Sequence, residues 1–276
     1  MKTAVKKSCY ILLMVVITQA SLGQGMQMGE VLIMNYPVLK EDVPKEALRR
    51  YIHQDIAPAW NDRKQRVGFH LFEADRGKGK GEYLLVCRLN KIADRKASLP
   101  AGSPFSDDVL LSGNSKKASD LLDNPNDFTE YHLLGADEFE SLPHIDILGI
   151  HYLKVKNTRT TDFEKFVVEK MHPSVGNLLP NMHLLTYKAV AGDAKGNYIT
   201  IFAIESTEAR DEYWPVGMPE TERLTQAFRP LKNLALELSD YLVSGSYLEP
   251  SGGAAAIFES KEWTDFIFQP QGKEQK

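Results

Sequence analysis

An internal repeat constrains the fold of this chain more than any other feature of its sequence. Residues 48–89 and 163–204 align without a gap at a constant offset of 115. The positions that are identical in both copies are Pro58 and Pro173, Ala74 and Ala189, Gly77 and Gly192, Lys80 and Lys195, Gly81 and Gly196, and Tyr83 and Tyr198. A repeat of this length is one supersecondary unit used twice, so the sequence predicts an internal pseudo-dimer.

The two copies also share the order of their expected elements. A strand-length apolar run (30–40 and 145–154) precedes a helical stretch that ends at a proline, and a hairpin with a glycine-rich turn follows. A further helical stretch is clear at 231–243, whereas residues 91–112 are rich in turn-forming residues and are predicted as largely loop. Residues 258–268 are predicted to contain a closing strand. The order strand, helix, strand, strand, helix, strand is that of the ferredoxin-like unit.

The expected strands are apolar at consecutive positions, which indicates that both faces of each sheet are covered. This pattern resembles the dimeric α/β-barrel superfamily, which includes antibiotic-synthesis-type and haem-degrading monooxygenases and EthD-like and NIPSNAP-like proteins. The resemblance lies in element order and duplication. It implies an α+β fold in which two tandem ferredoxin-like units, residues 28–143 and 144–268, pack their antiparallel sheets face to face as an intramolecular barrel. Residues 269–276 are expected to be a polar tail.

The N-terminus predicts export. Residues 1–23 combine a lysine-containing start, an apolar run at 10–17 and small residues before a cut expected after Gly23, as in a secretory signal peptide. The run is shorter than the ~20 residues that span a bilayer, although an N-terminal anchor is the alternative. Cleavage removes three of the 33 basic residues and none of the 37 acidic ones, which leaves a net charge of −7. We therefore expect a periplasmic or extracellular protein that neither inserts into a membrane nor binds nucleic acid.

No motif in the chain identifies a reaction. The run Gly77–Gly81 lacks the Gly-Lys-Ser/Thr ending of a phosphate loop, and turn glycines explain it. The seven histidines show no ligand spacing and no cysteine cluster accompanies them, so no metal site is predicted. Cys87, the only cysteine of the mature chain, lies in an apolar strand and is expected to be buried and inert. Catalytic residues and cofactor stay unassigned, with haem as the lesser option that the superfamily resemblance implies.

Strand parity suggests a ligand site instead. His70 shares a strand face with Phe72, and His183 shares one with Tyr187. In the opening strands, Tyr36 and His151 hold equivalent positions at the offset of 115. If these faces point inward, the space between the sheets is lined by Tyr36, His70, Phe72, His151, His183 and Tyr187. Aromatic cavities with a few polar groups are typical of small-molecule sites.

The sequence thus predicts an exported α/β barrel that holds a small, mostly apolar or aromatic molecule between its two sheets. The first alternative is a cofactor-free or haem-handling monooxygenase-like enzyme, since such enzymes shield an activated substrate from water and need few polar groups. The second alternative is a barrel whose rings simply fill the interior and which serves in an assembly. The volume of the cavity between the sheets distinguishes a filled barrel from the other two.

Overall fold

Eight antiparallel strands close into one barrel in the order β1-β3-β2-β8-β5-β7-β6-β4. The computed structural model describes residues 26–57, 67–99, 102–107, 117–136, 142, 144–175, 181–215, 221–244, 246 and 263–269, so the predicted signal peptide and residues 270–276 of the predicted tail lie outside it. The strands are β1 (Val31–Asn35), β2 (Val67–Gly77), β3 (Tyr83–Leu89), β4 (Thr129–Ala136), β5 (Ile147–Leu153), β6 (Met182–Gly192), β7 (Tyr198–Ile204) and β8 (Trp263–Phe268).

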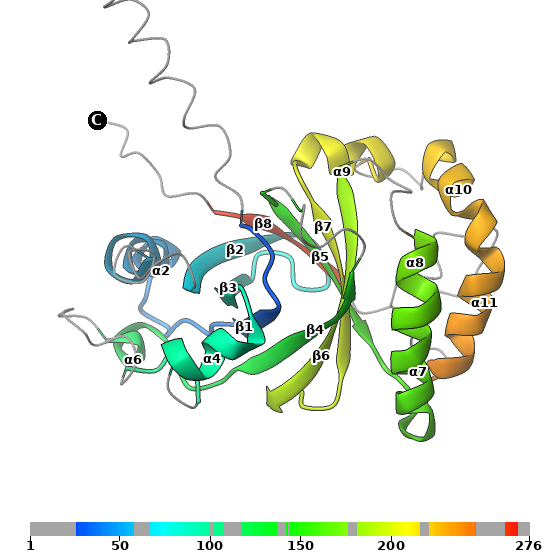
Figure 1. The fold of residues 1–276 in the computed structure, drawn as a ribbon. Helices are drawn as coiled ribbons and strands as arrows, with labels where there is room; N and C mark the ends of the chain where they lie inside the picture. Colours follow the sequence, from blue (N-terminus) through cyan, green and yellow to red (C-terminus); the bar gives the residue numbers. More distant parts are fainter. Residues whose placement is uncertain are drawn as a thin grey trace, which may run out of the picture.

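Helices cover the barrel on two opposite sides (Figure 1). On one side lie α2 (Lys45–Arg50), which continues as a π-helical turn over Tyr51–Ile56, α4 (Ile92–Ser98) and α6 (Ala118–Leu121). On the other side lie α7 (Thr160–Phe166), with a π-helical turn over Val167–Met171, α8 (His172–Val175), α10 (Glu222–Phe228) and α11 (Lys232–Tyr241), and α9 (Thr207–Tyr213) follows β7. None of the helices in these described segments is long and apolar enough to cross a membrane.

The expected α+β class and the antiparallel barrel are confirmed. Strands β4-β1-β3-β2 form one half of the barrel and strands β8-β5-β7-β6 form the other, in the same order. Two seams join the halves, because β2 pairs with β8 and β4 pairs with β6. The two sheets therefore do more than face each other, since their edges are hydrogen-bonded into one closed surface without free edges.

Three apolar clusters explain why the strands are apolar at consecutive positions. One cluster fills the barrel and takes side chains from all eight strands, among them Leu32, Phe72, Leu84, Tyr131, Leu148, Tyr187, Ile201 and Phe266. The other two clusters lie between the outer faces of the strands and the helices of each half. Six of the strands thus bury both of their faces, and the seam strands β4 and β8 bury theirs in part. Complete burial of one large apolar side chain contributes roughly 1.5–3 kcal/mol.

Two local expectations have different outcomes. Gly77, Gly81, Gly192 and Gly196 have φ values of 91°, 86°, 83° and 92°, so the interpretation of the glycine-rich runs as turns is confirmed. The prediction of loop over residues 91–112 is wrong for Ile92–Ser98, which is the helix α4. No residue of α4 is buried, so the sequence has no apolar stripe there. The helix is instead tied to the barrel by Arg95, whose Nε lies 2.8 Å from Glu130 Oε2.

We expect that neither half folds as a monomer. Separate expression of residues 28–143 and 144–276 breaks both seams and exposes the interior cluster, a larger apolar patch than a soluble monomer tolerates. Size-exclusion chromatography and thermal melting of each half, alone and mixed, check this. The intact chain is the control, and two soluble monomeric halves with cooperative melting would contradict the expectation.

Candidate functional site

Five of the six predicted lumen residues lie on the inner face of the barrel. Phe72 and Tyr187 belong to the interior cluster and Tyr36 packs against it. Tyr187 is fully buried, and its hydroxyl donates a hydrogen bond to the Gly29 carbonyl at 2.9 Å. His70 and His183 share the inward parity of Phe72 and Tyr187 and are half-buried. Their role as ligand contacts stays a prediction.

The sixth residue, His151, is on the wrong face for that prediction. Strand pairing makes Asn35 its counterpart, because Asn35 pairs with Leu85 of β3 and His151 pairs with Thr200 of β7. The opening strands therefore correspond at an offset of 116, and the residue equivalent to Tyr36 is Tyr152. Since a shift of one residue turns a side chain to the opposite face, His151 points toward the helices. Its ring packs edge-on against Phe202, with the centroids 5.3 Å apart.

The barrel interior is packed along its middle and hollow at one end. The hollow, here called the barrel-end cavity, has a volume of about 340 Å³. It is lined by Met34, Asn35, Tyr36, Asn124, Asp127, Phe128, Thr129, Tyr131, Tyr152, Asp193, Ala194 and Asn197. The space between the sheets is therefore neither empty nor wholly filled.

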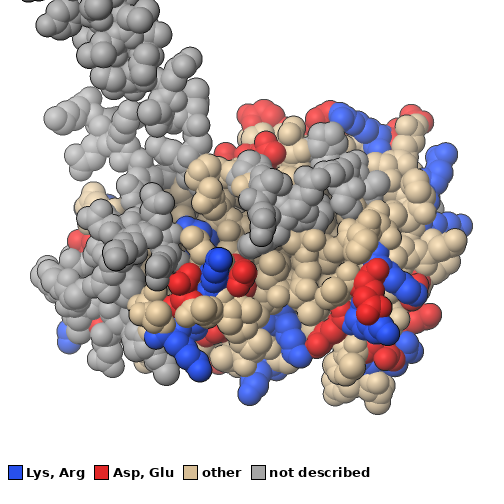
Figure 2. Space-filling model, in the orientation of Figure 1, with Lys and Arg blue, Asp and Glu red and all other residues tan. Residues whose placement is uncertain are grey.

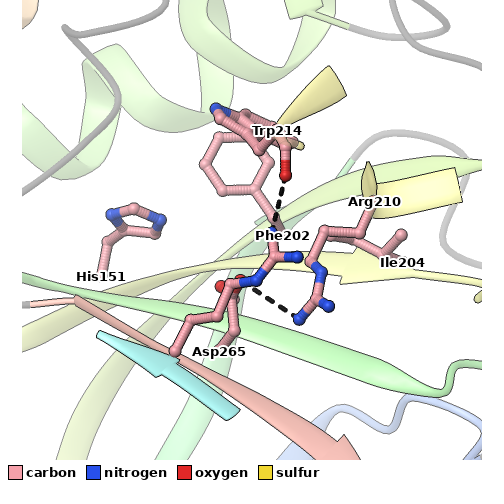
Figure 3. Close-up of a pocket in the computed structure, with 8 residues that line it drawn as sticks. His151, Phe202, Ile204, Arg210, Trp214 and Asp265 are labelled. Carbon is pink, nitrogen blue, oxygen red and sulfur yellow. Dashed lines mark hydrogen bonds and ion pairs between the residues drawn. The ribbon is translucent and has the colours of Figure 1, made fainter. Parts of the chain in front are cut away.

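A second cavity, here called the helix-side cavity, lies on the outer face of the second half (Figure 3). It has a volume of about 90 Å³ and is partly open to solvent. Strands β2, β5, β7 and β8, together with α9 and the residue that follows it, supply its lining. The lining residues are Arg76, Gly149, His151, Phe202, Ile204, Arg210, Trp214 and Asp265.

A missing side chain opens this cavity. Gly149 pairs with Phe202 on one neighbouring strand and with Asp265 on the other. A Cβ atom at Gly149 would lie 3.2 Å from Asp265 Oδ1 and 3.4 Å from Phe202 Cβ, so even one methyl group is tight. In the first half, Ile33 of β1 stands in the same arrangement between Cys87 and Glu130, and it is completely buried in apolar packing.

Charges concentrate on the wall formed by β8, α9 and β2. Arg210 Nη1 lies 2.7 Å from Asp75 Oδ2 and 3.6 Å from Asp265 Oδ2, and Arg210 Nε donates to Asp211 Oδ1 at 3.0 Å. Arg76 pairs across the sheet with Asp265 and donates from Nη1 to the Trp214 carbonyl at 2.6 Å. The Arg210 side chain is only 4% exposed. The buried Arg210 and the half-buried Asp265 thus lie beside the aromatic rings of Phe202 and Trp214 (Figure 3), and the half-buried Arg76 adds a second guanidinium group to this wall.

The two titratable groups nearest the apolar wall are shifted toward their neutral forms. Burial raises the pKa of Asp265 to about 6, although Arg210 and Arg76 act in the opposite direction. Burial lowers the pKa of His151 to about 3, so its imidazole is neutral at physiological pH. Asp265 is therefore a carboxylate that changes protonation state close to neutral pH, as a general base requires.

Protonation of His151 should destabilise the protein in acid. The unfolded chain binds this proton near pH 6.5 and the folded chain only near pH 3, so the stability that the neutral ring contributes is complete above pH 6.5 and is lost as pH falls toward 3. At pH 5 the loss is about 2 kcal/mol. Urea unfolding at pH 5 and pH 7.5 should show a smaller difference in His151→Asn than in the wild type. His144→Gln, which alters an exposed ring, is the control, and an unchanged pH dependence in His151→Asn would refute the assignment.

The sequence did not point to Arg76, Gly149, Arg210 or Asp265 as site residues. One usable signal was present, because Arg95 and Arg210 are also separated by the repeat offset of 115. In each half this arginine contacts an acid of the last strand, Glu130 or Asp265. This arginine lies outside the aligned segments but is identical in both copies. A search of the repeat for identical charged residues could therefore have pointed to Arg210.

In the parts of the chain that the structure describes, no group of three or more His, Cys, Asp or Glu side chains could hold a metal ion. On the face shown in Figure 2, basic and acidic side chains are interspersed rather than gathered by sign.

No protein-family model and no curated protein matches the chain. Among solved structures, it is similar to a candidate monooxygenase from Lactobacillus acidophilus (14% identity, TM-score 0.45, covering 88% of this chain and 96% of that one). It is also similar to an anthrone oxidase-like protein (10%, 0.45, 88% and 93%) and to a candidate monooxygenase from Fusobacterium nucleatum (10%, 0.48, 90% and 94%). These likenesses are too distant to carry an inference about chemistry.

Proposed function

We propose that the helix-side cavity takes the acidic end of a compact aromatic substrate and that Asp265 removes a proton from it, as in a cofactor-free monooxygenase. The observation that carries this proposal is a carboxylate with a pKa of about 6 at the wall of a cavity that Gly149 opens. The perpendicular rings of Phe202 and Trp214, with centroids 5.9 Å apart, supply an aromatic wall for such a substrate. Arg210 and Arg76 stabilise the anion that forms.

The oxygenation step needs no further oxidant or reductant than dioxygen. After Asp265 takes the proton of an activated C–H group, the carbanion gives electrons to O₂ and a C–O bond forms. The proton returns to the outer peroxide oxygen, and loss of water with the second C–H proton leaves a carbonyl group. One oxygen atom ends in the product and the other in water. The neutral His151 and the aromatic rings keep bulk water away from the anion.

Haem does not fit this site. The cavity of about 90 Å³ admits only the edge of an aromatic molecule, whereas haem would have to bring its whole porphyrin ring up to a ligand residue. His151 also packs edge-on against Phe202 rather than facing an open space. We therefore derive no step through haem.

We propose in addition that the two halves are diverged copies of one ferredoxin-like unit, residues 28–143 and 144–268, in an exported protein. Equivalent contacts support the duplication: the amide of Gly79 donates to Thr264 Oγ1 at 3.2 Å, and the amide of Ala194 donates to Thr129 Oγ1 at 3.3 Å. The Arg95–Glu130 and Arg210–Asp265 pairs agree with it. In this scheme the second half supplies most of the helix-side cavity and β2 of the first half adds Arg76, whereas Ile33 fills the equivalent place on the outer face of the first half.

Asp265→Asn should abolish proton abstraction. Anthrone, an aromatic ketone with an acidic methylene group, is a suitable probe, and NMR under nitrogen follows exchange of its methylene protons with D₂O. We expect the enzyme-catalysed exchange to rise with pH through about 6, where Asp265 loses its proton, and to fall at least ~100-fold in the variant. Glu130→Gln alters the acid in the same place of the first half, which has apolar packing instead of a cavity, and should leave exchange unchanged. Wild-type exchange in folded Asp265→Asn would disprove the role of this residue.

Gly149→Ala should impair substrate binding without unfolding the protein. The added methyl group lands against Asp265 and Phe202, while the φ angle of Gly149 is in the range that alanine adopts. We expect the apparent affinity for anthrone to fall about tenfold, and the free energy of unfolding to change by less than ~1 kcal/mol, because alanine is also less flexible than glycine. Titration of exchange rate against anthrone concentration measures the first quantity and urea unfolding the second. Unchanged affinity would place the substrate elsewhere.

A further inference from the structure

We propose that the barrel-end cavity binds a small organic cation, an ammonium group with an apolar body. This cavity shares no lining residue with the helix-side cavity, so the inference is independent of the proposed oxygenase site. Its volume of about 340 Å³ falls within the roughly 300–1,000 Å³ that small-molecule sites occupy.

Aromatic residues make up one part of its lining. They are Tyr36, Phe128, Tyr131 and Tyr152. Tyr36 and Tyr152 meet hydroxyl to hydroxyl across the barrel, with one O–H donating to the other oxygen. Besides this hydroxyl pair, the four rings present aromatic carbon to the cavity. Aromatic faces attract cations through their quadrupole, and several rings around one space are the usual way to hold a substituted ammonium ion.

A buried amide forms the second part of the lining. Asn35 is 1% exposed and lines the cavity. Its Nδ2 donates to the backbone carbonyls of Asn124, at 3.1 Å, and Asp127, at 2.6 Å, which fixes the orientation of the amide. Its Oδ1 is buried and accepts no hydrogen bond from any described residue. Because this oxygen has almost no accessible surface, a molecule in the cavity does not reach it, and the amide serves to fix the shape of the wall.

The charged side chains that line the cavity are acidic, which favours a cationic ligand. Asp127 and Asp193 are exposed at the rim of the cavity, and its lining, all of it within the described part of the chain, contains neither lysine nor arginine. An anion would meet two carboxylates there, whereas a cation is attracted by both. The lining thus favours a cationic ligand with apolar surface over a neutral or anionic one of equal size.

Isothermal titration of the full chain with choline and with its uncharged carbon isostere, 3,3-dimethylbutan-1-ol, tests the inference. We expect saturable choline binding, weakened by salt, and binding of the isostere that is at least about tenfold weaker. Equal affinity for the two probes would overturn the assignment of a cation, and absence of binding for choline at millimolar concentration would overturn the site.

The double variant Asp127→Asn/Asp193→Asn tests whether the two carboxylates at the rim cause the preference for a cation. Both side chains are exposed, so the fold should be retained. We expect the preference for choline over the isostere to drop several-fold while the affinity for the isostere stays constant. Asp240→Asn, which removes an exposed charge on α11, is the matched control and should bind choline as the wild type does. A double variant with the wild-type preference would contradict the proposal. The double variant and Asp240→Asn should both exchange the methylene protons of anthrone at the wild-type rate. A result that contradicts the cation site can therefore be told apart from one that contradicts the proposed oxygenase site.

Discussion

Closure of the barrel through the β2–β8 and β4–β6 seams is the constraint on which the rest of the structure depends. Without the seams, each half would be a four-stranded sheet with two free edges and one uncovered apolar face. With them, the inner faces share one cluster and the outer faces remain for the helices. Because neighbouring strands alternate in direction around the barrel, β1 and β5 run the same way on opposite sides. This alternation brings Tyr36 and Tyr152 together at one end and creates the barrel-end cavity there.

The architecture was largely readable from the sequence, but the facing of individual side chains was not. A repeat at constant offset requires two similar units, and consecutive apolar positions require that both faces of each strand be covered. Strands that are apolar at consecutive positions lack the polar–apolar alternation that normally tells which side chains point into the core. The hairpins of the two halves correspond at an offset of 115 and the opening strands at 116. Because the strands are apolar at consecutive positions, the hydrophobic pattern does not reveal this difference. The difference was enough to put His151 on the helix side, where Tyr152 replaces it as the counterpart of Tyr36.

The candidate site was missed for a related reason. Arg95 and Arg210 keep the offset of 115, but their partners Glu130 and Asp265 are separated by 135 residues, because the segment between arginine and acid is 20 residues longer in the second half. No search at constant offset connects the two acids. Gly149 was equally hidden, since a glycine in an apolar strand has no distinct pattern of its own, and only the paired strands show that it stands where Ile33 does.

The two acids differ in how closely positive partners compensate their charge. Glu130 has Arg95 at 2.8 Å and His132 at 2.9 Å, in surroundings that Ile33 and Cys87 fill. Asp265 lies farther from its arginine, at 3.6 Å, and Arg210 is shared with Asp75 and Asp211. Burial with incomplete compensation raises the pKa of Asp265 to about 6, which means that the folded state loses stability as pH rises from about 4 to 6 and this carboxyl group ionises. A protein that keeps a charge in such a place needs stability from elsewhere. Here the two seams and the apolar packing between the strands and helices of the first half supply it, so the outer face of the second half can hold an open cavity and a weakly compensated carboxylate.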